Sequence, residues 1–282
     1  MSPTIVFRKM NIEDISDGVQ LCRYASWNQV EQDWQFILNI DPEGSIVAVD
    51  TDKVVGAVST IKYGNDFSWI GMVLVDPQYQ KQGIGHTLLK LTLDILQKET
   101  TIKLDATPQG REIYLKLNFR DEYPLTRMVC EIVRELPEEK RVSVITAKEF
   151  EKINNYDKKI FGANRKVLLG GMFEKYPQYA FYYEDNGKIK GYCLGRNGHL
   201  YTQLGPIVAD ELSIGKKLLL TVLKKIQGKV VVDIFQHSAE WTDWLGSLGF
   251  KKERSFVRMY HGQNNFGGIL NNQFAITGPE FG

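Results

Sequence analysis

The stretch from Val73 to His86, VLVDPQYQKQGIGH, constrains the fold more than any other part of the sequence. The apolar, β-branched run from Trp69 to Val75 is typical of a buried strand, and Asp76-Pro77 ends it because proline cannot continue a central ladder. Gly83 and Gly85 then precede a leucine-rich segment that suits a largely buried helix. Glycine permits a positive φ and close approach of a ligand. The loop N–H groups and the helix dipole converge on one point, which predicts an anion-binding site.

We compared this stretch with two nucleotide-binding patterns, and it departs from both. A dinucleotide fold would place Gly-x-Gly-x-x-Gly directly after the strand, but the third glycine position is Leu88, and seven residues separate Val75 from Gly83. Asp105 lies at the distance expected of a ribose-binding acid, so a dinucleotide-binding dehydrogenase stays an alternative. A P-loop requires Lys-Ser/Thr after its last glycine, which His86-Thr87 does not supply. A glycine-rich turn without a ligand is the structural alternative.

The glycine loop also carries a family motif. Gln80-Lys81-Gln82-Gly83-Ile84-Gly85 resembles motif A of the GNAT (GCN5-related N-acetyltransferase) superfamily, Gln/Arg-x-x-Gly-x-Gly/Ala, at each defined position. The resemblance implies that backbone amides of this loop hold the pyrophosphate of acetyl-CoA (coenzyme A). The cofactor-binding residues that it implies are Leu74, Val75, Gln80, Lys81, Gln82, Gly83, Ile84, Gly85 and His86.

Composition restricts the class of protein. The 282 residues have room for two domains, and 43% hydrophobic with 24% charged residues describes a soluble globular chain. A net charge of +1 gives no electrostatic basis for binding nucleic acid or an anionic membrane, and no apolar run would span a bilayer. The N-terminus lacks a signal-peptide layout. Cys22, Cys130 and Cys193 show no disulfide or zinc spacing, and no histidine has a metal-ligand partner. We expect reduced thiols, no metal and a cytoplasmic protein.

Strand patterns in the first half form an antiparallel meander that leads into the central strand. The predicted strands span residues 5–10, 45–49, 54–62, 69–75 and 101–105. A helix capped by Asn11 and a second one ending near Ile40 follow the first strand. A crossover helix makes the strands at 69–75 and 101–105 parallel neighbours. The expected fold class is α/β (α+β), with tandem GNAT folds, each a mixed, mostly antiparallel sheet flanked by helices.

A second motif follows the strand at 101–105. Pro108 suits the first turn of a helix. The segment from Tyr114 to Phe119 resembles motif B of the superfamily, Tyr-x-x-x-Gly-Phe, with Asn118 where glycine is usual, and asparagine tolerates the left-handed conformation at a helix end. In the family this tyrosine donates a proton to the departing CoA thiolate, so the resemblance implies that Tyr114 is catalytic. A phenol is protonated at neutral pH and suits that role. Packing between helix and sheet is the structural alternative.

The acceptor side has weaker signals. Family enzymes often deprotonate the amine with a carboxylate near the start of the central strand, where Asp66 lies. Neither Asp66 nor Asp33 matches a family motif closely enough to be named as the base. For both, a solvated or helix-capping carboxylate stays the alternative. Two indoles and an amide close together would form a shaped, partly polar pocket, with core packing as the alternative. The predicted substrate-binding residues are Trp27, Asn28, Asp33 and Trp34.

The second half repeats the first in degenerate form. A hairpin turning at Asn186-Gly187 precedes a strand at 204–208 and a helix at 215–226. The loop between them lacks the glycine motif and carries Asp210 and Glu211 where a pyrophosphate would lie, and like charges repel strongly in a dry site. Leu245 takes the position of Tyr114 and has no proton to donate. We therefore expect that the second half does not bind acetyl-CoA and is not catalytic.

Four segments of the second half resemble YitH-type two-domain GNAT proteins: Phe161–Arg165, Gly191–Arg196, Leu204–Asp210 and Phe256–Tyr260. Their arginines Arg165, Arg196 and Arg258 are candidates to bind an anionic acceptor group, with ion pairs as the alternative. The predicted domains are a catalytic GNAT N-acetyltransferase domain at 1–135, a degenerate GNAT-like domain at 141–262 and a C-terminal arm at 263–282 that docks on the body or on a partner subunit. Leu125 to Arg134 would close the first domain's sheet.

The predicted function is direct transfer of an acetyl group from acetyl-CoA to a primary amine in a ternary complex. The acceptor is expected to be a small-molecule or peptide amine, and nucleic acid and membranes are not expected partners. A homodimer is left open. The alternative is a non-catalytic acyl-CoA-binding sensor or scaffold that kept the cofactor loop.

Overall fold

The structure is a computed structural model that describes residues 5–131, 136, 139, 141–236, 238–265 and 268–282. The predicted domain boundary falls largely on residues outside the described ones, as does the segment Met1–Thr4. Within the described residues, no helix is long and apolar enough to cross a membrane. Cys22, Cys130 and Cys193 are buried.

The first half consists of a strand meander and two pairs of helices. Its strands are β1 (Ile5–Lys9), β2 (Ile46–Asp50), β3 (Lys53–Tyr63), β4 (Phe67–Val75), β5 (Thr101–Ala106) and β6 (Arg120–Cys130). Its helices are α1 (Ile15–Tyr24), α2 (Glu31–Ile40), α3 (Ile84–Ile95) and α4 (Pro108–Lys116). Strands β1 to β4 pair in antiparallel succession and β4 pairs with β5 in parallel, which confirms the predicted meander and crossover.

The second half has the same order of elements. Its strands are β7 (Val142–Val144), β8 (Phe181–Asp185), β9 (Lys188–Asn197), β10 (Thr202–Ala209), β11 (Val230–Phe235), β12 (Lys251–Gly262) and β13 (Gln273–Ala275). Its helices are α5 (Ala147–Phe161), α6 (Lys166–Lys175), α7 (Leu212–Leu223) and α8 (Ala239–Ser247). The mixed, mostly antiparallel sheet and its flanking helices occur twice, which confirms the predicted fold class.

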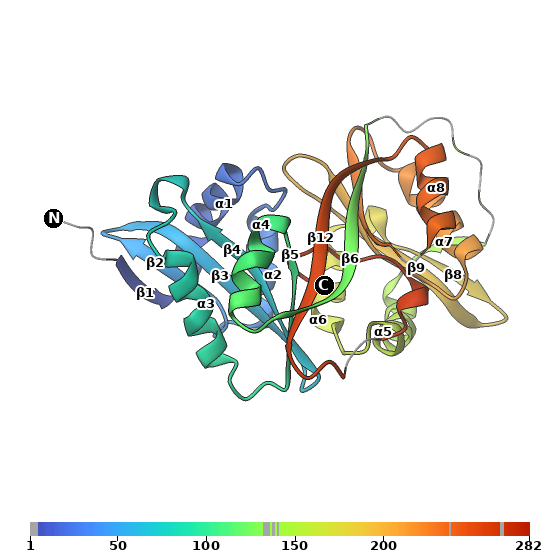
Figure 1. Cartoon of the computed structure of the whole chain (residues 1–282). Helices are drawn as coiled ribbons and strands as arrows, with labels where there is room; N and C mark the ends of the chain where they lie inside the picture. Colours follow the sequence, from blue (N-terminus) through green and yellow to red (C-terminus); the bar gives the residue numbers. More distant parts are fainter. Residues whose placement is uncertain (1–4, 132–135, 137–138, 140, 237, 266–267) are drawn as a thin grey trace.

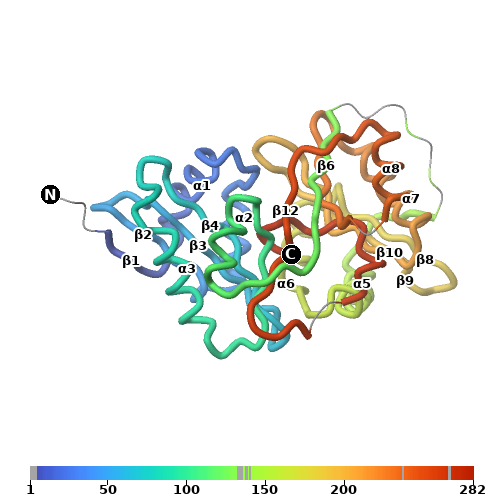
Figure 2. The backbone as a smooth tube through the Cα atoms, viewed as in Figure 1, coloured from blue at the N-terminus to red at the C-terminus, as the bar shows by residue number. Residues whose placement is uncertain are grey.

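The two halves share one continuous sheet because they exchange their last long strands. The strand order is β1-β2-β3-β4-β5-β12-β6-β11-β10-β9-β8-β7. Figure 1 and Figure 2 show β12 and β6 side by side where the halves meet. The prediction that residues 125–134 close the first sheet is corrected here, because β6 lies between β12 and β11, and β12 takes the place beside β5. The N–H and C=O groups of a strand must pair with a neighbouring strand, but the residue pattern of the strand does not specify which neighbour that is.

A hydrophobic core also crosses the junction. Trp34 and Ile37 of α2 belong to the same buried cluster as Leu169 and Met172 of α6 and Phe281 of the tail. Helices α3 and α4 pack on the other face of the first half, and α7 and α8 cover the second half in a core of their own. Burial of apolar surface at the junction therefore adds to the strand pairing that joins the halves.

Candidate active site

The central strand β4 leaves its neighbour β5 part-way along its length. The two strands pair at Ser68 with Ile102 and at Trp69 with Lys103, whereas β4 continues to Val75. A bulge accompanies the separation, because Met72 has a φ of 53° and the register against β3 shifts between Ala57 and Ser59. A cavity of about 970 Å³ lies at this opening and is lined by residues 70–75 of β4 and by Leu104 and Asp105 of β5. The opening thus exposes the edge of a strand inside a concave site.

The glycine loop forms one end of this cavity. Gly83 has a φ of 84° and precedes α3. The first backbone hydrogen bond of the helix runs from the Thr87 N–H to the Gly83 carbonyl at 3.0 Å. The N–H groups of Ile84, Gly85 and His86 precede it at the positive end of the helix dipole, so they are available to an anion. Gly85 lies inside the helix, so the positive φ that glycine permits is used at Gly83 and not at Gly85.

The space beside this loop suits a bulky anion. A Cβ added at Gly83 would meet no atom within 4 Å, and one at Gly85 would meet Val75 Cγ2 at 3.5 Å. The predicted cofactor residues that line the cavity are Leu74, Val75, Gln80, Lys81, Gly83, Ile84, Gly85 and His86. Gln82 is not part of the lining, and its side-chain Nε2 donates to the Gln78 carbonyl at 3.3 Å. The residues present therefore fit a pyrophosphate group.

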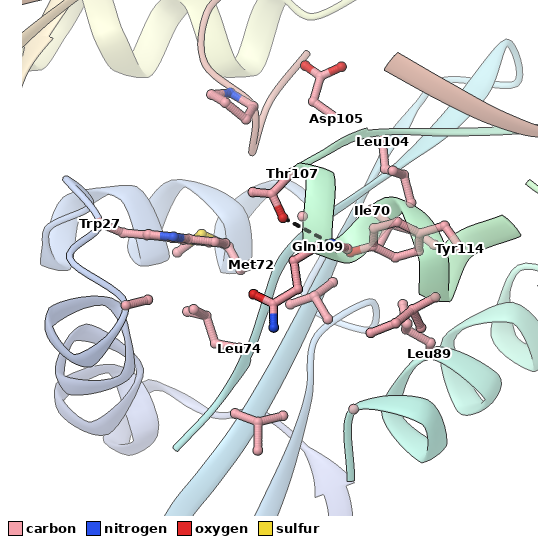
Figure 3. A pocket seen from close by; sticks show the side chains of 18 of the residues that line it. Trp27, Ile70, Met72, Leu74, Leu89, Leu104, Asp105, Thr107, Gln109 and Tyr114 are labelled. Atoms are coloured by element: carbon pink, nitrogen blue, oxygen red, sulfur yellow. Dashed lines mark hydrogen bonds between the residues drawn. The ribbon is translucent and has the colours of Figure 1, made fainter. Parts of the chain in front are cut away.

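Tyr114, the predicted proton donor, lines the cavity. Helix α4 begins at Pro108 under the cap of Thr107, whose Oγ1 accepts from the Gly110 N–H at 3.1 Å, and this places Tyr114 on the cavity wall. In Figure 3 its ring lies beside Ile70, on the opposite side of the cavity from Trp27. Burial raises the pKa of the Tyr114 phenol well above its ordinary value, so the group is protonated at neutral pH. Asn118 has a φ of 64°, the left-handed conformation expected at this helix end.

The four predicted acceptor residues have different environments. Trp27 lines the cavity. Trp34 is fully buried in the core, because α2 turns that face toward α6. Asn28 is bonded to the second half, where its Oδ1 accepts from the Leu200 N–H at 2.8 Å. Asp33 accepts from the Val30 N–H at 2.8 Å and from Arg196 at 3.0 Å, and both side chains of that pair are fully buried. Core packing of Trp34, hydrogen bonding of Asn28 and ion pairing of Asp33 thus take three of the four away from the cavity lining.

The other candidate residues, Asp66 and three arginines, do not have the roles considered for them. Asp66 lies in the β3–β4 turn and is absent from the lining. The three arginines considered for anion binding are buried in ion pairs, which bears out the alternative: Arg165 with Asp157 at 2.8 Å, Arg196 with Asp33 at 3.0 Å and Arg258 with Asp105 at 2.8 Å. Because Arg258 engages Asp105, this carboxylate is not free to bind a ribose.

Several lining residues had no local signal in the sequence. They come from the loop before α2, from the exchanged strands and from the tail: Gln29, Arg127, Arg254, Phe256, Pro279 and Glu280. Strand exchange and tail docking bring them to β4, and neither event leaves a short-range pattern. The second half thus contributes to the cavity wall of the first.

Two family models match the sequence. The model described as "Acetyltransferase (GNAT) family" matches residues 12–119, and the one described as "Acetyltransferase (GNAT) domain" matches residues 153–275. The matches cover both halves of the sheet and, in the first half, the glycine loop and Tyr114. The chain belongs to the GNAT acetyltransferase family.

Relatives of this GNAT protein agree with the assignment. Holothin acyltransferase of Pseudoalteromonas sp. (strain SANK 73390) is 26% identical over 241 residues, which cover 84% of this chain and 81% of the relative. YitH of Bacillus subtilis (strain 168), described as an uncharacterised N-acetyltransferase, is 23% identical over 248 residues, 87% of either chain. The family models and these acyltransferase names identify an acyltransferase enzyme.

Solved structures show the same tandem GNAT fold. A protein from Pyrococcus horikoshii has a TM-score of 0.84 at 23% identity and covers 99% of this chain and 96% of its own. A tandem GNAT protein from the clavulanic acid biosynthesis pathway has a TM-score of 0.65 at 15% identity, with coverage of 93% and 100%.

The second GNAT fold has its equivalent opening filled by the chain itself. Strands β10 and β11 pair from Thr202 to Leu204, and beyond this point β13 pairs with β10 at Ile207 and Val208. The ring of Phe274 packs on Gly215 of α7, 3.1 Å from where a Cβ would lie. Asp210 is held by Lys190 at 2.8 Å. A ligand would have to displace β13 from this opening.

Proposed function

We propose that the chain transfers an acetyl group from acetyl-CoA to a primary amine, by direct attack in a ternary complex, at the opening between β4 and β5. The observation that carries this proposal is one cavity that extends from the glycine loop, past Tyr114, to Trp27 and the tail of the second half. A cofactor and an acceptor can therefore meet without a covalent enzyme intermediate.

The cavity-lining residues divide into three roles. The N–H groups at the start of α3 would hold the pyrophosphate, with Lys81 and His86 nearby on the same wall. The thioester would supply an activated acetyl group to the cavity, whose wall includes the β4 bulge at Met72. Tyr114 would protonate the departing thiolate, since its phenol carries a proton at neutral pH.

The domain assignment follows the same division. Residues 1–135 would contain the catalytic GNAT domain and residues 141–262 a GNAT-like domain without its own cofactor, while the arm at 263–282 completes both. The filled opening beside β10 supports a single cofactor site in the chain.

Release of free CoA thiol over a panel of primary amines, amino acids, polyamines and peptides tests the proposal. We expect thiol release that depends on an added amine and yields the N-acetylated product. Binding of acetyl-CoA with no amine-dependent release across the panel would support the sensor or scaffold instead. Binding of NAD(H) without binding of CoA would support the dehydrogenase alternative.

A further inference from the structure

The tail of the second half ends on the central strand of the first. The Trp69 indole Nε1 donates to the Pro279 carbonyl at 3.0 Å, and the Tyr63 hydroxyl donates to the Phe281 carbonyl. The Glu280 backbone crosses Gly71 so closely that a Cβ there would lie 2.8 Å from the Glu280 carbonyl oxygen. These contacts fix Glu280 beside Gly71, two residues beyond Trp69, the last position at which β4 pairs with β5.

Two side-chain oxygen atoms of residues that line the cavity have no hydrogen-bond donor among the described residues. They are Oε2 of Glu280 and Oε1 of Gln29, which belong to side chains from opposite halves. Glu280 is 3% and Gln29 6% exposed, and both residues line the cavity. A buried acceptor without a donor costs about 1–3 kcal/mol, so each oxygen favours a ligand that brings N–H groups. A primary amine or ammonium brings two or three.

The charges around Glu280 favour a cation at the same place. Arg196 bonds to Glu280 through Nη2 and to Asp33 through Nη1, so two carboxylates share one guanidinium. Arg127, which also lines the cavity, is paired with Asp233 at 2.7 Å. Among the described residues, Glu280 thus shares its bonded cation with Asp33, while Arg23, whose charge lowers the pKa of Asp33, donates to the Gln29 carbonyl at 2.8 Å. A buried carboxylate that shares its bonded cation still attracts an ammonium group.

We propose that Gln29 and Glu280 bind the amine of the acceptor and that Glu280 takes its proton before attack. This inference rests on the proposed acetyl transfer and names the acceptor site within it. Asp33 cannot serve instead, because its Oδ1 accepts from Arg196 and its Oδ2 from the Val30 N–H, and it does not line the cavity. Asp66 is likewise absent from the lining.

The proton balance of the step is closed. The ammonium nitrogen passes one proton to Glu280 Oε2, and the free amine attacks the thioester carbonyl. A C–N bond forms and the C–S bond breaks. The thiolate takes the phenol proton of Tyr114, and the second proton from the nitrogen restores that phenol through solvent. Glu280 releases its proton to water when the products leave, so the sum is one ammonium and one thioester giving one amide, one thiol and one proton.

The cavity lining includes the apolar side chains of Trp27, Met72 and Phe256 as well as Arg254, and its apolar part suits an aromatic alkylamine. The probes are therefore 2-phenylethylamine, an ammonium at pH 7, and hydroxylamine, which is largely neutral there. We expect Glu280→Gln to lower kcat/KM for 2-phenylethylamine roughly 100-fold and for hydroxylamine less than tenfold. Glu280→Asp keeps the charge and should recover part of the loss. Equal losses on both amines would overturn the proton-transfer role.

Calorimetry with 2-phenylethylamine on the CoA-saturated full chain gives a second measurement that needs no turnover. Gln29→Leu leaves the described hydrogen bonds of the fold intact, because Oε1 has no donor, and should weaken binding about tenfold. Asp157→Asn is the matched control: it breaks a buried pair with Arg165 beside the same tail, away from the cavity lining. Binding unaffected by Gln29→Leu and Glu280→Gln, or absent in the native protein, would refute the amine site. Binding without acetyl transfer would instead refute the proposed function.

Discussion

Arg196 of β9 and Asp33 of α2 form a hydrogen bond of 3.0 Å between two fully buried side chains that belong to opposite halves of the protein. Their separation in sequence is 163 residues. Burial raises the pKa of Asp33 to about 6; the Arg196 charge opposes this shift, and the Glu280 charge adds to it. The pair thus links the stability of the junction to pH and to the carboxylate that we assign to the acceptor amine.

The first prediction concerns this pH dependence. Between about pH 4 and pH 6 native Asp33 keeps a proton that the unfolded chain has lost, since the ordinary value is 3.8. The native state then binds more protons, so the contribution of Asp33 to the free energy of unfolding falls as pH rises through this window, by roughly 1–3 kcal/mol. Asp33→Asn should flatten that slope in urea unfolding at pH 4.5, 5.5, 6.5 and 7.5. A slope unchanged by Asp33→Asn would disprove the assignment.

The second prediction concerns Tyr114. Tyr114→Phe should lower kcat by roughly 100-fold or more while acetyl-CoA affinity stays within a factor of two, because the hydroxyl acts on the departing thiolate. Its ring contact with Phe119, at 5.8 Å between centroids, is retained, so the melting temperature should not fall. Steady-state kinetics and calorimetric titration of acetyl-CoA check both parts. Equal turnover in the two proteins would remove Tyr114 from the mechanism.

The third prediction separates ligand contact from folding at the glycine loop. Gly85→Ala adds a methyl group that meets Val75 at an ordinary 3.5 Å, and alanine favours a helix by up to about 1 kcal/mol. We expect unchanged or higher stability together with at least tenfold weaker CoA binding. Gly246→Ala in α8 is the matched control, since a Cβ there meets nothing within 4 Å. It should leave CoA affinity unaltered, and a similar loss in both variants would argue against a phosphate at Gly85.

The fourth prediction concerns the filled opening of the second half. Phe274 is buried against Gly215 and Trp241, whose indole N–H donates to the Phe274 carbonyl at 3.0 Å. Phe274→Ala should cost about 3–5 kcal/mol of unfolding free energy. Titration should show that the native protein binds one CoA per chain. The Phe274→Ala variant should also bind one CoA per chain at a temperature where it is folded. Two equivalents in the native protein would show that β13 gives way to a ligand.

Short-range features of the site were predictable from the sequence. The strand, glycine loop and helix from Trp69 to Ile95, the left-handed Asn118 and the capped start of α4 depend on residues a few positions apart. Their backbone geometry follows from hydrogen bonds and steric limits within one or two turns. The absence of a glycine motif between β10 and α7 was also predictable. Asp210 and Glu211 in that loop would repel a phosphate.

The acceptor side was not predictable in this way. Trp34 and Asp33 were expected at the substrate, but the structure places them in the core and in a buried ion pair. Glu280 and Gln29 have no motif around them. Nothing in the pattern of β6 or β12 indicated that these strands change places, because alternation of apolar side chains sets a strand's faces and not its neighbour.

The sequence by itself determined two GNAT folds and one glycine loop fit for a pyrophosphate, since those depend on local conformation and on residue types at fixed spacing. Only the tertiary structure decided which residues complete the cavity wall. Strand exchange and docking of the tail bring Pro279 to Trp69 across 210 residues of sequence. The partner of each buried charge is then set by the side chains that this packing places beside it. Long-range contacts of this kind are selected by burial and charge compensation over the whole chain, which no short segment encodes.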